Sequence, residues 1–274
     1  MTTHDQLHSN RLRYEMSVEL VKGEVSKISA LRSAPHTKQL QFSMDICLVA
    51  LGVRTAYLVD ALTPPDPVSV FTSLLKSLRS KSQLFGDVFL LSVPMHMQTF
   101  FVRRTVLLEY TLLNFPSFVL LDQNLTVSPS EPDGLRDILL NWSCEILRQG
   151  GLSCSLPDDL TQEPLIPLAG VLLDYPLAYV PVSAHQSTFL AGEPLDVYEV
   201  AFNHPSRDVF STPGTSEFVF IKFSCPQRVG EKDSSLSPSC LLLLLKHKFG
   251  FRLENIGAIV SVRHYTEKLD RVAL

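Results

Sequence analysis

Short, continuously apolar runs alternate with amphipathic helical segments in the first half of this chain, and this alternation constrains the fold more than any other feature. Residues 55–60, 87–93 and 118–122 are runs of this kind. A strand that is apolar at every position is typical of a sheet covered on both faces. Alternation with helices is typical of a parallel or mixed sheet. We therefore expect an α/β fold with a mixed sheet, parallel in the N-terminal half and with helices on its faces.

Helical periodicity and capping residues mark the segments between these runs. Residues 14–32 and 38–51 have the spacing of helices. Asp66 is placed to cap a helix that begins at Pro67, where the missing amide proton costs nothing. Ser130 is placed to cap the most regular helix, whose single stripe predicts a tryptophan in the core. That stripe comprises Leu135, Ile138, Leu139, Trp142 and Ile146.

The second half of the chain is predicted to contain mostly strands and loops. Residues 151–167 contain three prolines and an acidic pair, which favours a linker or surface excursion. Further strands are expected at 171–174, 177–180, 197–202 and 218–223. Loops rich in proline, serine and glycine separate the later strands, so we expect a strand-rich antiparallel extension of the sheet. We expect residues 1–274 to form a single globular domain.

Composition excludes several classes of protein. The chain is 45% hydrophobic and 19% charged, which is ordinary for a globular protein and unlike a disordered one. Its net charge is −4 without a long basic block, so neither nucleic acid nor an anionic membrane is expected as a partner. No run approaches the roughly 20 apolar residues of a membrane-spanning helix. The first 20 residues lack the apolar core of a signal peptide, which favours a cytoplasmic or nuclear location.

Standard catalytic motifs are absent from the sequence. It contains no glycine-rich phosphate loop, no Gly-x-Ser-x-Gly turn and no His-Glu-x-x-His helix. The leading hypothesis is therefore a protein without a cofactor that acts through contacts with other proteins.

Aspartates at the ends of predicted strands support an alternative hypothesis. Asp60, Asp122 and Asp174 each follow an apolar run, and ligands of open α/β sheets bind beyond the carboxyl ends of strands. Three carboxylates there could hold Mg²⁺ in a phosphohydrolase-like enzyme. Aspartate is also a common turn former that bonds the backbone just beyond itself. His185 and His204 lie in polar loops after strands and are the candidates for proton transfer.

Two segments resemble a known family. Residues 170–181 (GVLLDYPLAYVP) and the tail 218–245 are similar to a vertebrate family named after an open reading frame on human chromosome 1. The resemblance implies an intracellular protein with a single domain. Because that family has no established activity, the resemblance implies no substrate, cofactor or site residue.

Overall fold

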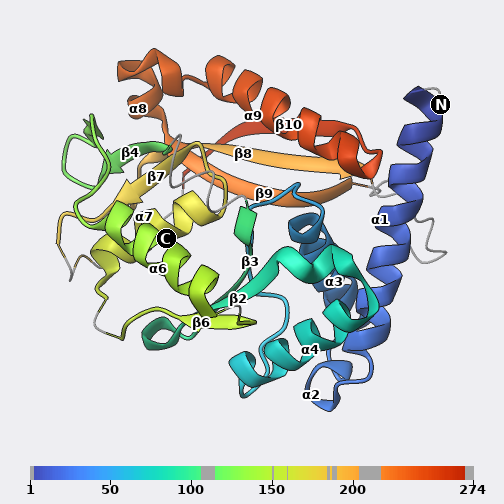
Figure 1. The fold of residues 1–274 in the computed structure, drawn as a ribbon. Coiled ribbons are helices and arrows are strands. Elements are labelled where there is room, and N and C mark those ends of the chain that lie inside the picture. Colours follow the sequence, from blue (N-terminus) through green and yellow to red (C-terminus); the bar gives the residue numbers. More distant parts are fainter. Residues whose placement is uncertain are drawn as a thin grey trace.

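The structure is a computed structural model. It describes residues 3–105, 115–149, 151–158, 160–183, 186, 190–203 and 217–268 of the chain. Within these residues the strands form three sheets, which we call sheets A, B and C (Figure 1).

Sheet A contains the first apolar runs of the sequence. Its order is β1-β3-β2-β6, with antiparallel β1–β3 and β3–β2 pairs and a parallel β2–β6 pair. Its strands are β1 (Ala56–Leu58), β2 (Val88–Val93), β3 (Gln98–Arg103) and β6 (Ser153–Ser155).

Sheets B and C complete the mixed architecture. In sheet B, β4 lies between antiparallel β5 and parallel β7. In sheet C, β8 lies between β10 and β9, and both pairs are antiparallel. The expected mixed α/β fold with an antiparallel C-terminal sheet is thereby confirmed. The strands are β4 (Ser117–Leu120), β5 (Val127–Ser128), β7 (Leu177–Val180), β8 (Pro194–Asn203), β9 (Glu217–Pro226) and β10 (Val260–Lys268).

Helices α3 and α4 pack on one face of sheet A and α6 on the other, α7 packs on β7 of sheet B, and α9 lies along sheet C (Figure 1). The α-helices are α1 (Thr3–Val25), α2 (Ser29–Arg32), α3 (His36–Ala50), α4 (Pro67–Lys81), α6 (Leu135–Gln149), α7 (Gln162–Leu172), α8 (Gln227–Lys232) and α9 (Pro238–Leu253). Short 3-10 helices are η1 (Gln83–Asp87), η2 (Pro94–His96), η3 (Ser234–Leu236) and η4 (Glu254–Ile256).

Alternate side chains of the central strands enter two different hydrophobic clusters. In β2, Val88 and Leu90 belong to the first cluster, with residues of α1, α3, α4, α9 and sheet C. Phe89 and Leu91 belong to the second cluster, with residues of α6 and α7. The continuous apolar runs therefore do form strands that are buried on both faces.

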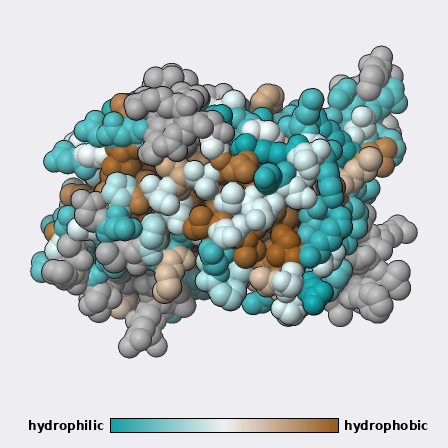
Figure 2. All heavy atoms as spheres, turned by 60° about the horizontal axis from the view of Figure 1, so that its bottom comes forward, coloured by the Kyte–Doolittle hydropathy of each residue, from teal (hydrophilic) through white to brown (hydrophobic). Residues whose placement is uncertain are grey.

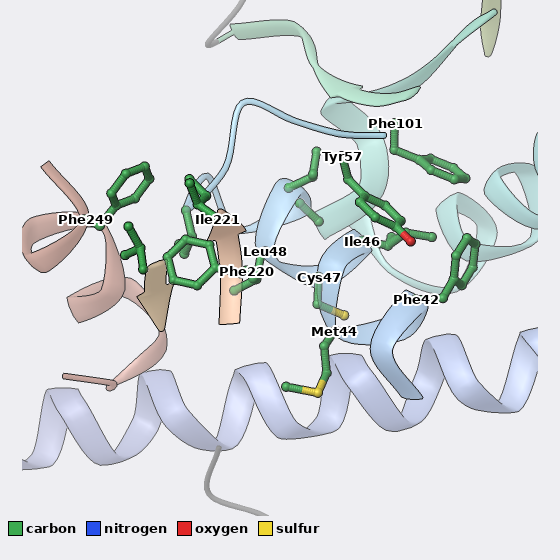
Figure 3. Packing of buried hydrophobic residues seen from close by; sticks show 14 of the residues in the cluster. Phe42, Met44, Ile46, Cys47, Leu48, Tyr57, Phe101, Phe220, Ile221 and Phe249 are labelled. Atoms are coloured by element: carbon green, nitrogen blue, oxygen red, sulfur yellow. The ribbon is translucent and has the colours of Figure 1, made fainter. Parts of the chain in front are cut away.

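Helix α3 runs through the first cluster. All nine residues from Phe42 to Ala50 are buried, as expected for a helix that is apolar on most faces. Figure 3 shows Phe42 and Phe101 at one end of the cluster and Ile221 and Phe249 at the other. Phe42 packs edge-on against Phe101, with ring centroids 5.9 Å apart. The helix therefore connects the core beneath sheet A to the core beneath sheet C.

Two helix starts test the capping predictions. Asp66 accepts a hydrogen bond from the Ser69 backbone N–H at 3.2 Å, and α4 begins at Pro67, so this prediction is confirmed. Ser130 does not cap the next helix, because α6 begins five residues later. Gly134 has a φ of 77°, a left-handed conformation outside the helical range, and the helix starts directly after it.

The segment predicted as a linker contributes regular structure instead. Residues 151–167 contain β6, which pairs with β2, and the first half of α7. Pro164 lies in the first turn of α7, where its missing N–H would have no intrahelical partner, and Pro167 is accommodated inside the helix. The strand predicted at 171–174 is also wrong, since α7 extends to Leu172. A short apolar run does not distinguish a buried helix from a strand.

The surface is mixed in polarity. On the face shown in Figure 2, apolar side chains reach the surface in separate patches between larger hydrophilic areas. No helix in the described ranges has both the length and the apolar character required to cross a bilayer.

Candidate functional site

A pocket of about 420 Å³ lies where the three sheets meet. Its walls include Leu58 of β1, Gln98 of β3, Leu177 of β7 and Val197 of β8. Helix α7 supplies a further wall. Because both hydrophobic clusters contribute residues to the lining, the pocket lies where the two cores adjoin.

One face of α7 lines the pocket. Leu165, Ala169 and Leu173 recur every four residues on that face. Gly170 faces β7, where an added Cβ would lie 2.6 Å from the Ala178 Cβ. Any larger residue at this position would push the helix away from the strand, so Gly170 permits the close packing of α7 on β7.

Aromatic side chains connect the pocket wall of sheet B to that of sheet C. The Tyr179 hydroxyl donates a hydrogen bond to the backbone carbonyl of Ser224 at 2.8 Å. The rings of Tyr175 and Phe223 pack with their centroids 5.6 Å apart. These contacts cross from β7 and the turn before it to β9, and they fix two walls of the pocket relative to each other.

A few polar side chains complete the lining. His96, Gln98 and Gln162 come from η2, β3 and the start of α7, and Lys222 and Glu267 come from sheet C. A mostly apolar pocket of this volume with a small number of polar groups is typical of a binding site for a small molecule.

Asp174 forms a buried junction next to the pocket. It lies one residue beyond the C-cap of α7, is only 1% exposed and has a φ of 66°. Its Oδ2 accepts hydrogen bonds from the Thr55 backbone N–H at 2.6 Å and from Arg252 Nη1 at 3.1 Å. Its Oδ1 lies 3.1 Å from Lys248 Nζ. One carboxylate thus joins the end of α7 to the residue before β1 and to α9.

The two basic partners of Asp174 come from one side of α9. Lys248 Nζ also donates to the Asp174 backbone carbonyl at 3.0 Å, and Arg252 Nη1 donates to the Val53 carbonyl at 3.2 Å. Burial lowers the pKa of Lys248, and the nearby Asp174 carboxylate opposes that shift. Since Leu173 and Tyr175 on either side of Asp174 line the pocket, this junction positions part of the pocket wall.

The other two predicted aspartates have separate local roles. Asp60 is exposed and accepts a hydrogen bond from the Tyr57 hydroxyl at 3.2 Å. Asp122 Oδ1 accepts from the backbone N–H groups of Asn124 and Thr126 at 3.0 and 3.1 Å. Partial burial raises the pKa of Asp122, but the hydrogen bonds from Thr126 and Asn124 together bring it below its usual range. Asp122 therefore closes a turn.

The described residues bring no three His, Cys, Asp or Glu side chains together as ligands for a metal ion. Asp60, Asp122 and Asp174 accordingly form no three-ligand site there. Asp174 also differs from the prediction in following a helix rather than a strand. His185 and His204 lie outside the described residues.

Sequence reasoning missed the pocket residues of α7. The positions 165, 166, 169 and 173 have helical spacing, which is the signal that could have identified this wall. Pro164 and Pro167 within the same segment indicated a loop instead.

Comparison with known proteins found no match for this chain. No protein-family model matches this chain, and no curated protein or solved structure matches it either. Its function is therefore inferred from the geometry of the pocket.

Proposed function

We propose that this chain binds a small, mostly apolar molecule in the pocket between α7 and the three sheets. The observation that carries the proposal is the pocket itself, with a volume of about 420 Å³ and a lining of mainly apolar side chains. Ligand sites in proteins commonly have volumes of roughly 300–1,000 Å³ and this composition.

Rigid contacts around the pocket support a binding function. Gly170 packs closely against Ala178, and Tyr179 bonds across to Ser224. Walls held in place before the ligand arrives reduce the ordering cost of binding. The pocket is therefore preformed rather than assembled by its ligand.

Filling the pocket is expected to weaken ligand binding without unfolding the protein. Ala169→Phe places a ring in the pocket, so the affinity for the neutral fluorescent probe N-phenylnaphthylamine should fall by about tenfold or more, or roughly 1.4 kcal/mol. Fluorescence titration measures this change. Ile166→Trp is a second filling variant, because Ile166 also lines the pocket.

Ala30→Phe is the matched control, since Ala30 is exposed on α2. It should bind the probe as the unmodified chain does. Unchanged probe binding by both filling variants, with native circular dichroism, would show that the probe does not occupy this pocket.

The hypothesis of protein contacts is favoured by a second observation, on the outer face of α9. Leu243 and Phe251 there are 71% and 73% exposed. Lys248 and Arg252 of this helix pair with Asp174, but Lys246 and His247 are exposed, and the helix has no acidic residue. Exposed apolar side chains with basic neighbours match a partner helix that carries apolar and acidic residues.

Serine substitutions on this face are expected to leave folding unchanged. Leu243→Ser and Phe251→Ser remove side chains that solvent already surrounds, so the free energy of unfolding should change by no more than about 0.5 kcal/mol. Urea unfolding of each variant measures it. A loss above about 1 kcal/mol would mean that the native chain itself covers this face, which would remove it as a partner surface.

A further inference from the structure

We infer that the ligand of this pocket is an amine, an apolar molecule with one positively charged nitrogen that pairs with Glu267. This inference rests on the proposed binding function and specifies its ligand class. Glu267 lines the pocket and is partly buried. Within the described part of the chain, no basic side chain lies within ion-pair distance of its carboxylate.

The other charges on this part of sheet C balance one another. Lys222 lies 3.4 Å from Glu199 and donates a hydrogen bond to the Tyr265 hydroxyl at 2.9 Å. Arg263 pairs with Glu199 at 3.3 Å and with Glu217 at 3.2 Å. Two cations thus face two carboxylates.

Among the described residues, Glu267 is therefore a pocket-lining carboxylate without a cationic partner, whereas the lining cation Lys222 is paired with Glu199. The next residue, Lys268, does not neutralise it, because successive side chains of a strand point to opposite faces. A partly desolvated carboxylate without a partner is unfavourable, and a ligand ammonium would supply that partner through a charge-assisted hydrogen bond.

The aromatic lining favours the same ligand. Tyr179 lines the pocket, whereas Phe223 and the Tyr175 ring packed on it lie toward the face of sheet C opposite to Glu267. Ring faces attract cations, and this attraction strengthens where water is excluded. The apolar body of the ligand would contact Leu58 and Leu165, which also line the pocket. The site therefore combines a carboxylate, a tyrosine ring and an aliphatic wall.

A series of three ligands with one shared body tests the inference. Phenylbutylamine, phenylbutanol and phenylbutyrate carry a positive, a neutral and a negative end on the same phenylbutyl group. Each is titrated against the full chain by calorimetry and by displacement of N-phenylnaphthylamine. The amine is expected to bind about tenfold more tightly than the alcohol, and the carboxylate more weakly than either.

Glu267→Gln should reduce the amine affinity to that of the alcohol and leave the alcohol affinity unchanged. The matched control is Glu254→Gln, because Glu254 is exposed in η4 and does not line the pocket. It should retain the full amine preference.

The outcomes separate this inference from the binding proposal. If the neutral probe binds but the amine binds no more tightly than the alcohol, or if Glu267→Gln retains the amine preference, the amine inference is overturned and the binding proposal stands. If neither the neutral probe nor any member of the series binds, both are overturned.

Discussion

Replacing Asp174 with alanine is expected to lower the free energy of unfolding by about 3–5 kcal/mol, the usual cost of removing one partner of a buried ion pair. The change removes the acceptor shared by Lys248, Arg252 and the Thr55 N–H. The two basic side chains would then face each other without the carboxylate between them. Alanine also tolerates the φ of 66° poorly. Denaturant unfolding at neutral pH measures the loss.

Two further variants test whether the loss of stability comes from the charge of Asp174 and whether it is specific to this aspartate. Asp174→Asn keeps the shape and one acceptor oxygen but removes the charge, so its cost should be a large part of the cost of the alanine change. Asp60→Ala is the control, because Asp60 is exposed, and it should cost no more than about 0.5 kcal/mol. An Asp174→Ala loss below about 1 kcal/mol would show that the junction is not a main source of stability.

Trp142→Ala is expected to cost a similar amount, about 3–5 kcal/mol, because it leaves a large cavity in the second hydrophobic cluster. Trp142 is 3% exposed, in a cluster that includes Leu135 and Leu139. Its ring lies edge-on to Phe89, with centroids 5.5 Å apart. Urea unfolding measures the loss, and the emission of the unmodified chain should be blue-shifted and poorly quenched by iodide.

Trp142→Phe is the informative control. Trp142 Nε1 is buried and has no hydrogen-bond partner within the described residues, so phenylalanine would lose packing volume but no hydrogen bond. A cost well below that of alanine is expected. An emission maximum like that of free tryptophan in the unmodified chain would contradict the buried position.

The strands of the first half were predictable because their environment leaves a local signature. The apolar runs at 87–93 and 118–122 became β2 and β4, whose side chains alternate between the two hydrophobic clusters. Trp142 was placed in the core by helical spacing alone, and the structure confirms this position. Sequence reasoning succeeded where the local pattern of apolar residues was sufficient to identify the strand or helix.

Helix α7 and the pocket were not predictable in this way. The run 171–174 was read as a strand because three apolar residues followed by an aspartate fit either structure, and tertiary packing against β7 decided for a helix. The partners of Asp174 lie 74 and 78 residues further along the chain. The role proposed for Glu267 depends on residues of neighbouring strands in sheet C. The local sequence around Glu267 does not identify those residues.

Because alternate side chains of β2 enter two different hydrophobic clusters, polarity alone does not fix the register in which β2 pairs with its neighbouring strands. In a sheet with one polar face, a slip by one residue moves apolar side chains into water and is strongly disfavoured. In β2 the same slip would exchange Phe89 for Leu90 and leave both faces apolar. Only mismatched volumes oppose it, since cores are closely packed. Side-chain size, more than polarity, therefore selects the native register of β2.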